Sequence, residues 1–267
     1  QASRRRAQQA DLLIGEHGLL AKDRVAEQLP DFKNVIIDDA DLLEKNLTSG
    51  AGSELSAEIL GSLLSLVFTE KKTSSILRLF SQQKIRSGVA QDLNEAIMLT
   101  EELQEKAYLF FGLFAIVLKK SSPEGGYQGK ITVRLDKSFS NSPDYYKVEK
   151  SGGGLALLLD ELGERLGRLV KLAAATQDDH TLYIISVLKN LIVRLSEIKI
   201  LVREFSGEMQ PEWIYWADLY DKEIKLQKVP RSARSYLRQA TEQAKASILI
   251  SRIFKTEDSF AYYEKRL

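Results

Sequence analysis

Two short apolar runs, one near each end of the chain, constrain the fold most strongly, because helical periodicity fills the sequence between them. Val35 to Ile37 is β-branched throughout and ends in acidic residues, and Ser247 to Ile250 is a second run. Such continuous runs are typical of parallel strands covered on both faces. Ala10 to Ile14 predicts another buried strand. The ends of the chain therefore predict an α/β domain with a parallel sheet.

The residues between these runs repeat their apolar side chains at helical spacing. Gly50 to Gly52 is a break, and Ser53 fits the N-cap position of a helix that follows. A second helix is predicted from about Ser74 to Ile85. A longer helix of roughly 25 residues carries the apolar positions from Leu93 to Leu118. Its aromatic residues are predicted to lie in the core rather than to stack on bases.

Short extended segments interrupt and follow the helices. Ile131 to Leu135 predicts a strand, and after a break at Gly152 to Gly154 two helices are predicted to form an antiparallel hairpin. The later predicted elements are the strands Trp213–Trp216 and Ile224–Leu226 and the helix Ser232–Ala244. This order is typical of one α/β domain with a large, mostly α-helical insertion. The predicted divisions are 1–48, 49–207 and 208–267.

Composition narrows the chemistry. The 267 residues include no cysteine, which excludes a disulfide or a thiolate metal site within this chain and is compatible with a reducing cytoplasm. No apolar stretch reaches the ~18 residues that span a bilayer, so no membrane partner is expected. The net charge of +1 is not that of a dedicated nucleic-acid binder. Because His17 and His180 are the only histidines, any chemistry is expected to rest on carboxylates.

Asp38 and Asp39 follow directly after the apolar run Val35 to Ile37. In ATPases a buried strand can end in two acidic residues. The first carboxylate binds Mg²⁺, and the second polarises the attacking water. Any buried strand that runs into an acidic turn produces the same pattern. On these residues alone, a purely structural interpretation therefore stays open.

Several segments before and after the acidic residues bear on the identity of the domain, and they occur in a defined order along the chain. Ala10 to Leu20 includes a histidine at position 17, and Leu29 to Glu44 carries the acidic run. The segments that follow the helical middle are Glu212–Trp216, Val229–Pro230, Ser247–Ser251 and Phe260–Leu267. Together they resemble motifs of the DinG and XPD group of superfamily-two helicases. The resemblance implies part of a RecA-like nucleotide-binding motor domain, interrupted by a helical arch domain.

The resemblance also implies roles for individual residues in an ATP-dependent DNA helicase. Asp38 would bind Mg²⁺ and the nucleotide, Asp39 would activate water, and Ser251 would belong to the motif that couples hydrolysis to movement on single-stranded DNA. ATP and Mg²⁺ would be cofactors of the intact parent. The chain itself is expected to be inactive, because the phosphate loop and the second motor domain of the family lie outside it. An iron–sulfur cluster stays undecided, since the family's cysteines would lie upstream.

The chain departs from the family at positions that bear on catalysis. Asp38-Asp39-Ala40-Asp41 stands where the family has Asp-Glu-Ala-His, and Glu16 stands where it usually has asparagine. Ile250 to Ile253 keeps only Ser251 of the coupling motif. An alternative is therefore a catalytically degenerate helicase derivative that acts as a DNA-binding or protein-interaction scaffold. A further alternative is a helical interaction module, which would lack neighbouring parallel strands.

One basic stretch could hold phosphates of a nucleic acid. Five positive charges fall within fourteen positions that contain no acidic residue, at Lys225, Lys228, Arg231, Arg234 and Arg238. A local stripe of this kind could contact DNA although the chain as a whole is nearly neutral. The alternative is an ordinary solvated surface.

Overall fold

The computed structural model describes residues 2–26, 29–70, 74–82, 89–121, 130–174, 178–221, 223–252 and 259. The chain is a mixed α/β protein with a small parallel sheet and a separate antiparallel sheet. It divides into two compact units. Unit 1 comprises residues 1–53, 211–214 and 228–267, and unit 2 comprises residues 54–210 and 215–227. Among the described residues, the longest helices are not apolar enough to cross a membrane.

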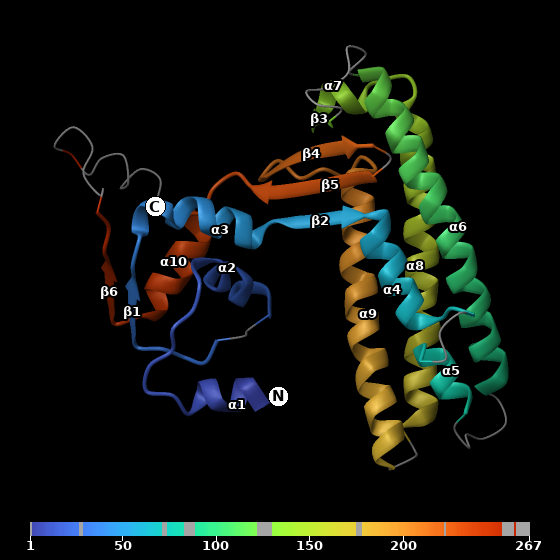
Figure 1. Ribbon diagram of the computed structural model, residues 1–267, viewed down its shortest axis with the longest axis horizontal. Coiled ribbons are helices and arrows are strands. Elements are labelled where there is room, and N and C mark those ends of the chain that lie inside the picture. Colours follow the sequence, from blue (N-terminus) through green and yellow to red (C-terminus); the bar gives the residue numbers. More distant parts are fainter. Residues whose placement is uncertain are drawn as a thin grey trace. The chain divides into compact units, whose positions relative to one another are not determined.

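Unit 1 contains a two-stranded parallel sheet and the helices that pack on it (Figure 1). Its elements are α1 (Ala2–Gln8), α2 (His17–Ala26), β1 (Asn34–Ile37), the 3₁₀ turn η1 (Ala40–Leu42), α3 (Leu43–Ala51), α10 (Arg234–Gln243) and β6 (Ala246–Leu249). The strands β1 and β6 pair in parallel, from Asn34 beside Ala246 to Ile37 beside Leu249. The predicted neighbouring strands at these two apolar runs are therefore confirmed.

The sheet of unit 1 is covered on one face only within the described part of the chain. Ile37 and Leu249 belong to a core that α2, α3 and α10 complete through Ala21, Leu43, Leu47, Ala233, Tyr236 and Leu237. On the other face Ile36, Ile248 and Ile250 are 66%, 52% and 49% exposed. The prediction of a sheet buried on both faces is therefore wrong for these residues. Period-two alternation turns successive side chains to opposite faces, and the described helices cover only one of them.

The apolar run Leu12 to Ile14 does not form the strand that its composition predicts. The segment has no regular secondary structure, and Leu12 and Ile14 are 76% and 87% exposed. A short apolar run cannot by itself supply the neighbouring strand that would satisfy its backbone groups. Two of the three predicted strands of the parallel sheet are thus present.

Unit 2 is a helical bundle joined to a four-stranded sheet (Figure 1). The helices are α4 (Ala57–Val67), α5 (Ile76–Ser81), α6 (Val89–Ser121), α7 (Lys137–Ser140), α8 (Tyr145–Ala173) and α9 (Asp179–Phe205). The strands are β2 (Ser53–Ser56), β3 (Lys130–Leu135), β4 (Trp213–Tyr220) and β5 (Glu223–Pro230), in the order β2-β5-β4-β3. Residues 54–56, 130–135, 215–220 and 223–227 of these strands belong to unit 2. The strands predicted at Ile131–Leu135, Trp213–Trp216 and Ile224–Leu226 are confirmed.

Helix α8 lies along both α6 and α9, so the predicted hairpin of α8 and α9 is confirmed. The core of this bundle includes Phe110, Phe111 and Phe114 of α6, which are buried as predicted, whereas Tyr108 is 82% exposed. The ring of Phe110 is in edge contact with the rings of Phe111 and Phe114. Tyr145 of α8 donates a hydrogen bond from its hydroxyl to the Phe205 carbonyl at 2.7 Å. That bond ties the start of α8 to the end of α9.

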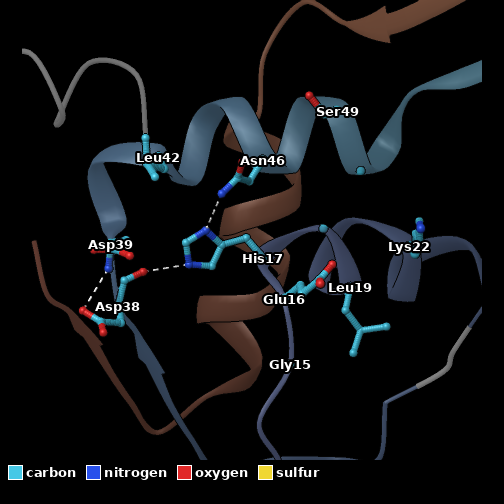
Figure 2. A pocket seen from close by; sticks show the side chains of 12 residues that line it. Gly15, Glu16, His17, Leu19, Lys22, Asp38, Asp39, Leu42, Asn46 and Ser49 are labelled. Carbon is cyan, nitrogen blue, oxygen red and sulfur yellow. Dashed lines mark hydrogen bonds between the residues drawn. The ribbon is translucent and has the colours of Figure 1, made fainter.

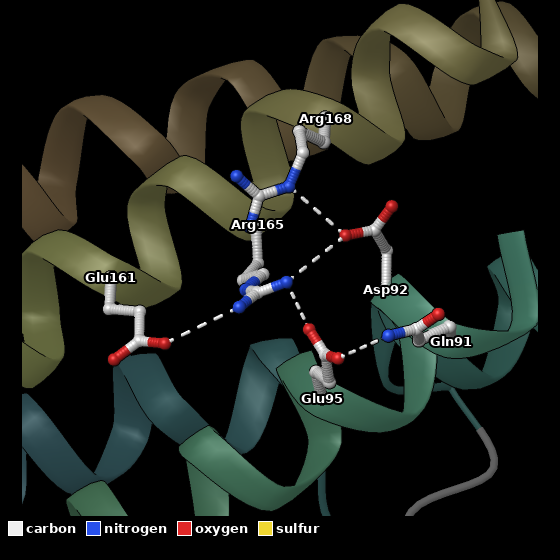
Figure 3. Close-up of polar contacts among 6 residues, drawn as sticks. All are labelled: Gln91, Asp92, Glu95, Glu161, Arg165 and Arg168. Atoms are coloured by element: carbon white, nitrogen blue, oxygen red, sulfur yellow. Dashed lines mark hydrogen bonds and ion pairs between the residues drawn. The ribbon is translucent and has the colours of Figure 1, made fainter.

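An ion-pair network joins the first turns of α6 to the last turns of α8 (Figure 3). Asp92 Oδ1 accepts from Arg168 Nε at 3.0 Å and lies 3.5 Å from Arg165 Nη1. Arg165 also pairs with Glu95 of α6 and, at 3.5 Å, with Glu161 of α8. Three carboxylates of the same unit therefore surround two guanidinium groups, although the buried Nε of Arg165 has no hydrogen-bond partner.

Two local predictions in unit 2 are wrong. Gly152 to Gly154 lie inside the continuous helix α8 rather than in a break, since packing against neighbouring helices outweighs the low helix propensity of glycine. Ser53 begins the strand β2, and the N-cap of α4 is Ser56, whose Oγ accepts a hydrogen bond from the Ile59 amide at 3.2 Å. The short helix α5 ends at Ser81.

Candidate functional site

The carboxyl ends of β1 and β6 are joined by hydrogen bonds that continue beyond the strands. The Ile250 amide donates to the Ile37 carbonyl at 2.8 Å, and the Ala40 amide donates to the Ile250 carbonyl at 2.9 Å. The turn that follows β1 is therefore held against the residues that follow β6. Two segments more than two hundred positions apart in sequence meet at this edge of the sheet.

Asp38 and Asp39 lie on the exposed turn directly after β1. Asp39 adopts a left-handed backbone conformation with φ 46° and ψ 46°, which aspartate tolerates better than most residues. Its amide donates to Asp38 Oδ1 at 2.9 Å (Figure 2). This local bond orients the Asp38 carboxylate at the end of the strand, as the acidic run predicts for a strand-end carboxylate.

His17, at the start of α2, connects this turn to α3. Its Nε2 lies 2.7 Å from the Asp38 carbonyl oxygen, and its Nδ1 lies 3.1 Å from Asn46 Nδ2 (Figure 2). A carbonyl only accepts hydrogen bonds, so we assign the proton to Nε2 and assign Nδ1 as the acceptor of the Asn46 amide. His17 thus fixes the backbone of Asp38 and does not present its ring as a free base.

A cavity of about 840 Å³ lies beside these residues, within unit 1 (Figure 2). Its lining includes Glu16, His17, Lys22, Asp38, Asp39 and Asn46. Three carboxylates against one ammonium give the cavity a negative balance, which favours a divalent cation. No cluster of three or more metal-ligating side chains occurs in the part of the chain that is described. Mg²⁺ fits such a site, because it needs one or two carboxylates and takes its other ligands from water and phosphate.

Ser251 follows β6 and contacts a different acid of the same turn. Its hydroxyl donates to Asp41 Oδ1, and both side chains are partly buried. The structure therefore places Asp38 and Asp39 at the cavity, and it places Ser251 at Asp41 on the neighbouring turn of η1. The link from Ser251 to the candidate cation site runs through the backbone from Asp38 to Asp41.

Sequence reasoning missed Asn46 and Lys22. Asn46 lies between Leu43 and Leu47, both fully buried, so a polar residue beside the apolar positions of α3 was the available signal. Lys22 follows the fully packed Ala21 on α2, and nothing in its local sequence distinguishes it from a surface lysine.

The five basic residues of the predicted stripe do not form one surface. Lys225 belongs to unit 2, where it lies 3.9 Å from Glu54 and 3.7 Å from Glu223, and the other four belong to unit 1. Lys228 is only 7% exposed, and its Nζ lies 4.2 Å from the centre of the Trp213 ring. A buried ammonium over an aromatic ring has little surface with which to meet a phosphate.

The other three basic residues differ in what they contact. Arg231 donates from Nε to the Pro211 carbonyl at 2.6 Å, and Arg238 pairs with Glu242 at 2.5 Å. The hydrogen bond from Arg238 to Glu242 raises the pKa of the guanidinium above its usual range. Arg234 is exposed at the start of α10. Arg231, Arg234 and Arg238 are all exposed, and Arg234 and Arg238 lie about one turn apart on α10.

Comparison with known proteins gives no family for the chain, since neither a protein-family model nor a curated protein matches it.

Proposed function

We propose that residues 1–48 and 208–267 are part of the nucleotide-hydrolysing motor of an ATP-dependent DNA helicase of the DinG and XPD type, and that residues 49–207 are its helical arch. The observation that carries the proposal is the parallel pairing of β1 with β6 together with the hydrogen bond from Ser251 to Asp41. These are the two segments that resemble the acidic motif and the coupling motif. Their direct contact supports a coupling of hydrolysis to movement, because hydrogen bonds join the turn after β1 to the residues after β6.

The site supports this chemistry through the Asp38 carboxylate at the strand end. Asp38 would hold Mg²⁺ together with water and nucleotide phosphate oxygens, and the bound ion would supply charge neutralisation at the phosphates. Asp39 would orient water from the lining of the cavity. His17 and Asn46 would keep the Asp38 backbone in place through their hydrogen bonds.

The uncovered face of the parallel sheet also supports the proposal. Ile36, Ile248 and Ile250 are exposed apolar residues on one face. Parallel sheets normally bury both faces, and a RecA-like motor domain does so with helices. In the intact parent, we propose that further motor-domain structure covers this face. Single-stranded DNA is the proposed partner, and Arg234 and Arg238 remain its candidate contacts.

The proposal is tested on the intact protein that contains this chain. We expect ATP hydrolysis that single-stranded DNA stimulates, and we expect Asp38→Asn to lower that rate on the order of 10²-fold or more. Asp31→Asn is the matched control, because the exposed Asp31 lies before the amino end of the same strand. Full activity of Asp38→Asn, or an equal loss in both variants, would refute the assignment of Asp38.

A second candidate is a helicase-derived scaffold that binds DNA or protein without efficient hydrolysis. The observation that favours it is Asp39, whose carboxylate is shorter than glutamate by one carbon–carbon bond, about 1.5 Å. A displacement of about 1 Å can reduce a rate on the order of 10²-fold. ATP turnover by the intact protein at the rates of ordinary helicases would exclude this candidate. An increase of a slow ATP hydrolysis rate by Asp39→Glu would support this second candidate.

A further inference from the structure

Helix α6 presents an outer face with the spacing of a coiled-coil seam. Its exposed residues follow one another at alternating intervals of four and three, at Met98, Glu102, Glu105, Leu109, Gly112, Ile116 and Lys119. Met98, Leu109 and Ile116 are 68%, 51% and 52% exposed. The opposite face of α6 is the one that packs inside unit 2, where Leu103, Phe110 and Phe114 are fully buried. A helix pairs with another over a long distance through apolar residues at 4-3 spacing, and Met98, Leu109 and Ile116 are the apolar members of this face.

Gly112 lies at the centre of this outer face. A Cβ there would meet nothing within 4 Å, so packing inside the chain does not explain the glycine. Glycine in an exposed helix interior costs about 1 kcal/mol relative to alanine. A glycine on an outward seam provides a shallow hole into which a large side chain of a second helix can fit.

The charged residues at the seam positions differ between its two ends. Glu102 and Glu105 lie in the first half, where the exposed Lys106 flanks them, and Lys119 lies at the end beside Lys120. Lys120 already pairs with Asp144 of the same chain, which leaves Lys119 as the lysine of the seam. A parallel second copy would place like charges opposite one another, whereas an antiparallel copy would place the acidic half against the basic end.

We propose that this outer face of α6 binds a second copy of the chain in an antiparallel arrangement. The twofold axis lies between Leu109 and Gly112, so that Leu109 of each copy fills the hole at Gly112 of the other. The same register sets Glu105 against the aliphatic Ile116 and Glu102 against Lys119. Each contact occurs twice by symmetry.

The expected association is weak. The seam from Glu102 to Lys119 is about 25 Å long at ~1.5 Å per residue. A two-helix contact of that length falls at the lower end of specific interface sizes, so we expect a dissociation constant in the micromolar range, on the order of 10⁻⁶–10⁻⁵ M. The charged pairs also predict weaker association at high salt. The inference does not depend on the proposed helicase function.

Charge reversal tests the interface and its direction together. Sedimentation velocity of the full chain over a range of concentrations should show a monomer–dimer equilibrium. Glu102→Lys alone and Lys119→Glu alone should each weaken it about tenfold or more, because each creates two like-charge contacts. An equimolar mixture of the two single variants should associate at least as well as the unmodified chain, and so should the double variant. In a parallel dimer each residue would face its own copy, so either single variant would only exchange one like-charge pair for another and would not weaken the association.

Glu197→Lys makes the same charge change on the exposed face of α9 and should leave the association unchanged. Leu109→Glu should abolish it. Circular dichroism establishes that each variant is folded. A chain that stays monomeric at concentrations well above the micromolar range, a dimer insensitive to Leu109→Glu, or single variants that the mixture does not rescue would each overturn the proposal.

Discussion

Three consecutive glycines in α8 are predicted to respond in opposite ways to alanine. A Cβ at Gly152 would lie 1.7 Å from Ser206 Oγ and 2.8 Å from Ser206 Cβ, whereas a Cβ at Gly153 or Gly154 would meet nothing within 4 Å. Gly152 is buried against the end of α9, and the other two glycines are exposed. Alanine therefore overpacks a helix contact at the first position and fills open space at the next two.

The magnitudes follow from two opposing effects. Alanine is favoured over glycine in a helix interior by about 0.8–1.0 kcal/mol, so Gly153→Ala and Gly154→Ala should each raise the free energy of unfolding by up to that amount. At Gly152 the same gain is opposed by overpacking, which typically costs about 1–3 kcal/mol. Ser206 is short and is held by the hydrogen bond from its Oγ to the Val202 carbonyl at 2.5 Å. We therefore expect Gly152→Ala to lower the free energy of unfolding by up to about 2 kcal/mol.

Urea unfolding of the full chain, followed by far-ultraviolet circular dichroism, measures these differences. A double-mutant cycle adds the cause, because Ser206→Gly removes both closest atoms and should reduce the cost of Gly152→Ala. Phe110 Cε2, at 3.0 Å from the added Cβ, would still limit the recovery. If Gly152→Ala stabilised the chain as much as its two neighbours do, the close approach of α8 to Ser206 would be refuted.

Three further variants test other contacts. Gly50→Ala should destabilise unit 1 by about 2 kcal/mol or more in thermal unfolding. The new Cβ would lie 2.5 Å from the Gly18 Cα, a backbone atom that cannot rotate away. An unchanged melting temperature would contradict the close crossing of α2 and α3. Arg165→Met should cost about 1–3 kcal/mol by leaving partly buried carboxylates of α6 without their main cation, and high salt should reduce that difference. The hydrogen bond from the Thr181 hydroxyl, and next the bond from the Thr181 amide, lower the pKa of the Asp178 carboxyl below its ordinary value of 3.8. The Asp178 N-cap therefore stabilises α9 fully above pH 3.8, and this stabilisation is lost as the pH falls through the lowered pKa. The difference in unfolding free energy between Asp178→Ala and the unmodified chain should therefore shrink on acidification, and a difference that does not change with pH would contradict the cap.

Local sequence was sufficient for many elements. The β-branched run Val35 to Ile37 and the alternating run Ile131 to Leu135 both form strands, and the heptad-like spacing of α6 forms a helix. In each case the side-chain period matches the backbone period, and the match needs no knowledge of the neighbours. Asp38 at the end of β1 followed from the same reasoning, since the polar residue after a buried strand is carried to the edge of the sheet.

Strand partners and helix continuity depended on residues distant in sequence. β3 pairs antiparallel with β4 about eighty positions later, and no property of Ile131 to Leu135 selects that partner. Leu12 to Ile14 has strand-like composition but lacks a hydrogen-bonded neighbour, so it stays irregular. α8 continues through three glycines because neighbouring helices stabilise it along its length.

The candidate site shows the same division. The sequence by itself determined that an apolar strand delivers Asp38 and Asp39 to a turn, because strand period and composition are local properties. Only the tertiary structure decided that His17 and Asn46 hold the Asp38 backbone and that Ser251 reaches Asp41 rather than Asp38. It also buried Lys228 over Trp213 and thereby divided a basic stretch that looked continuous in sequence. Hydrogen bonds and burial depend on which distant segments meet, and the order of residues along one segment does not contain that information.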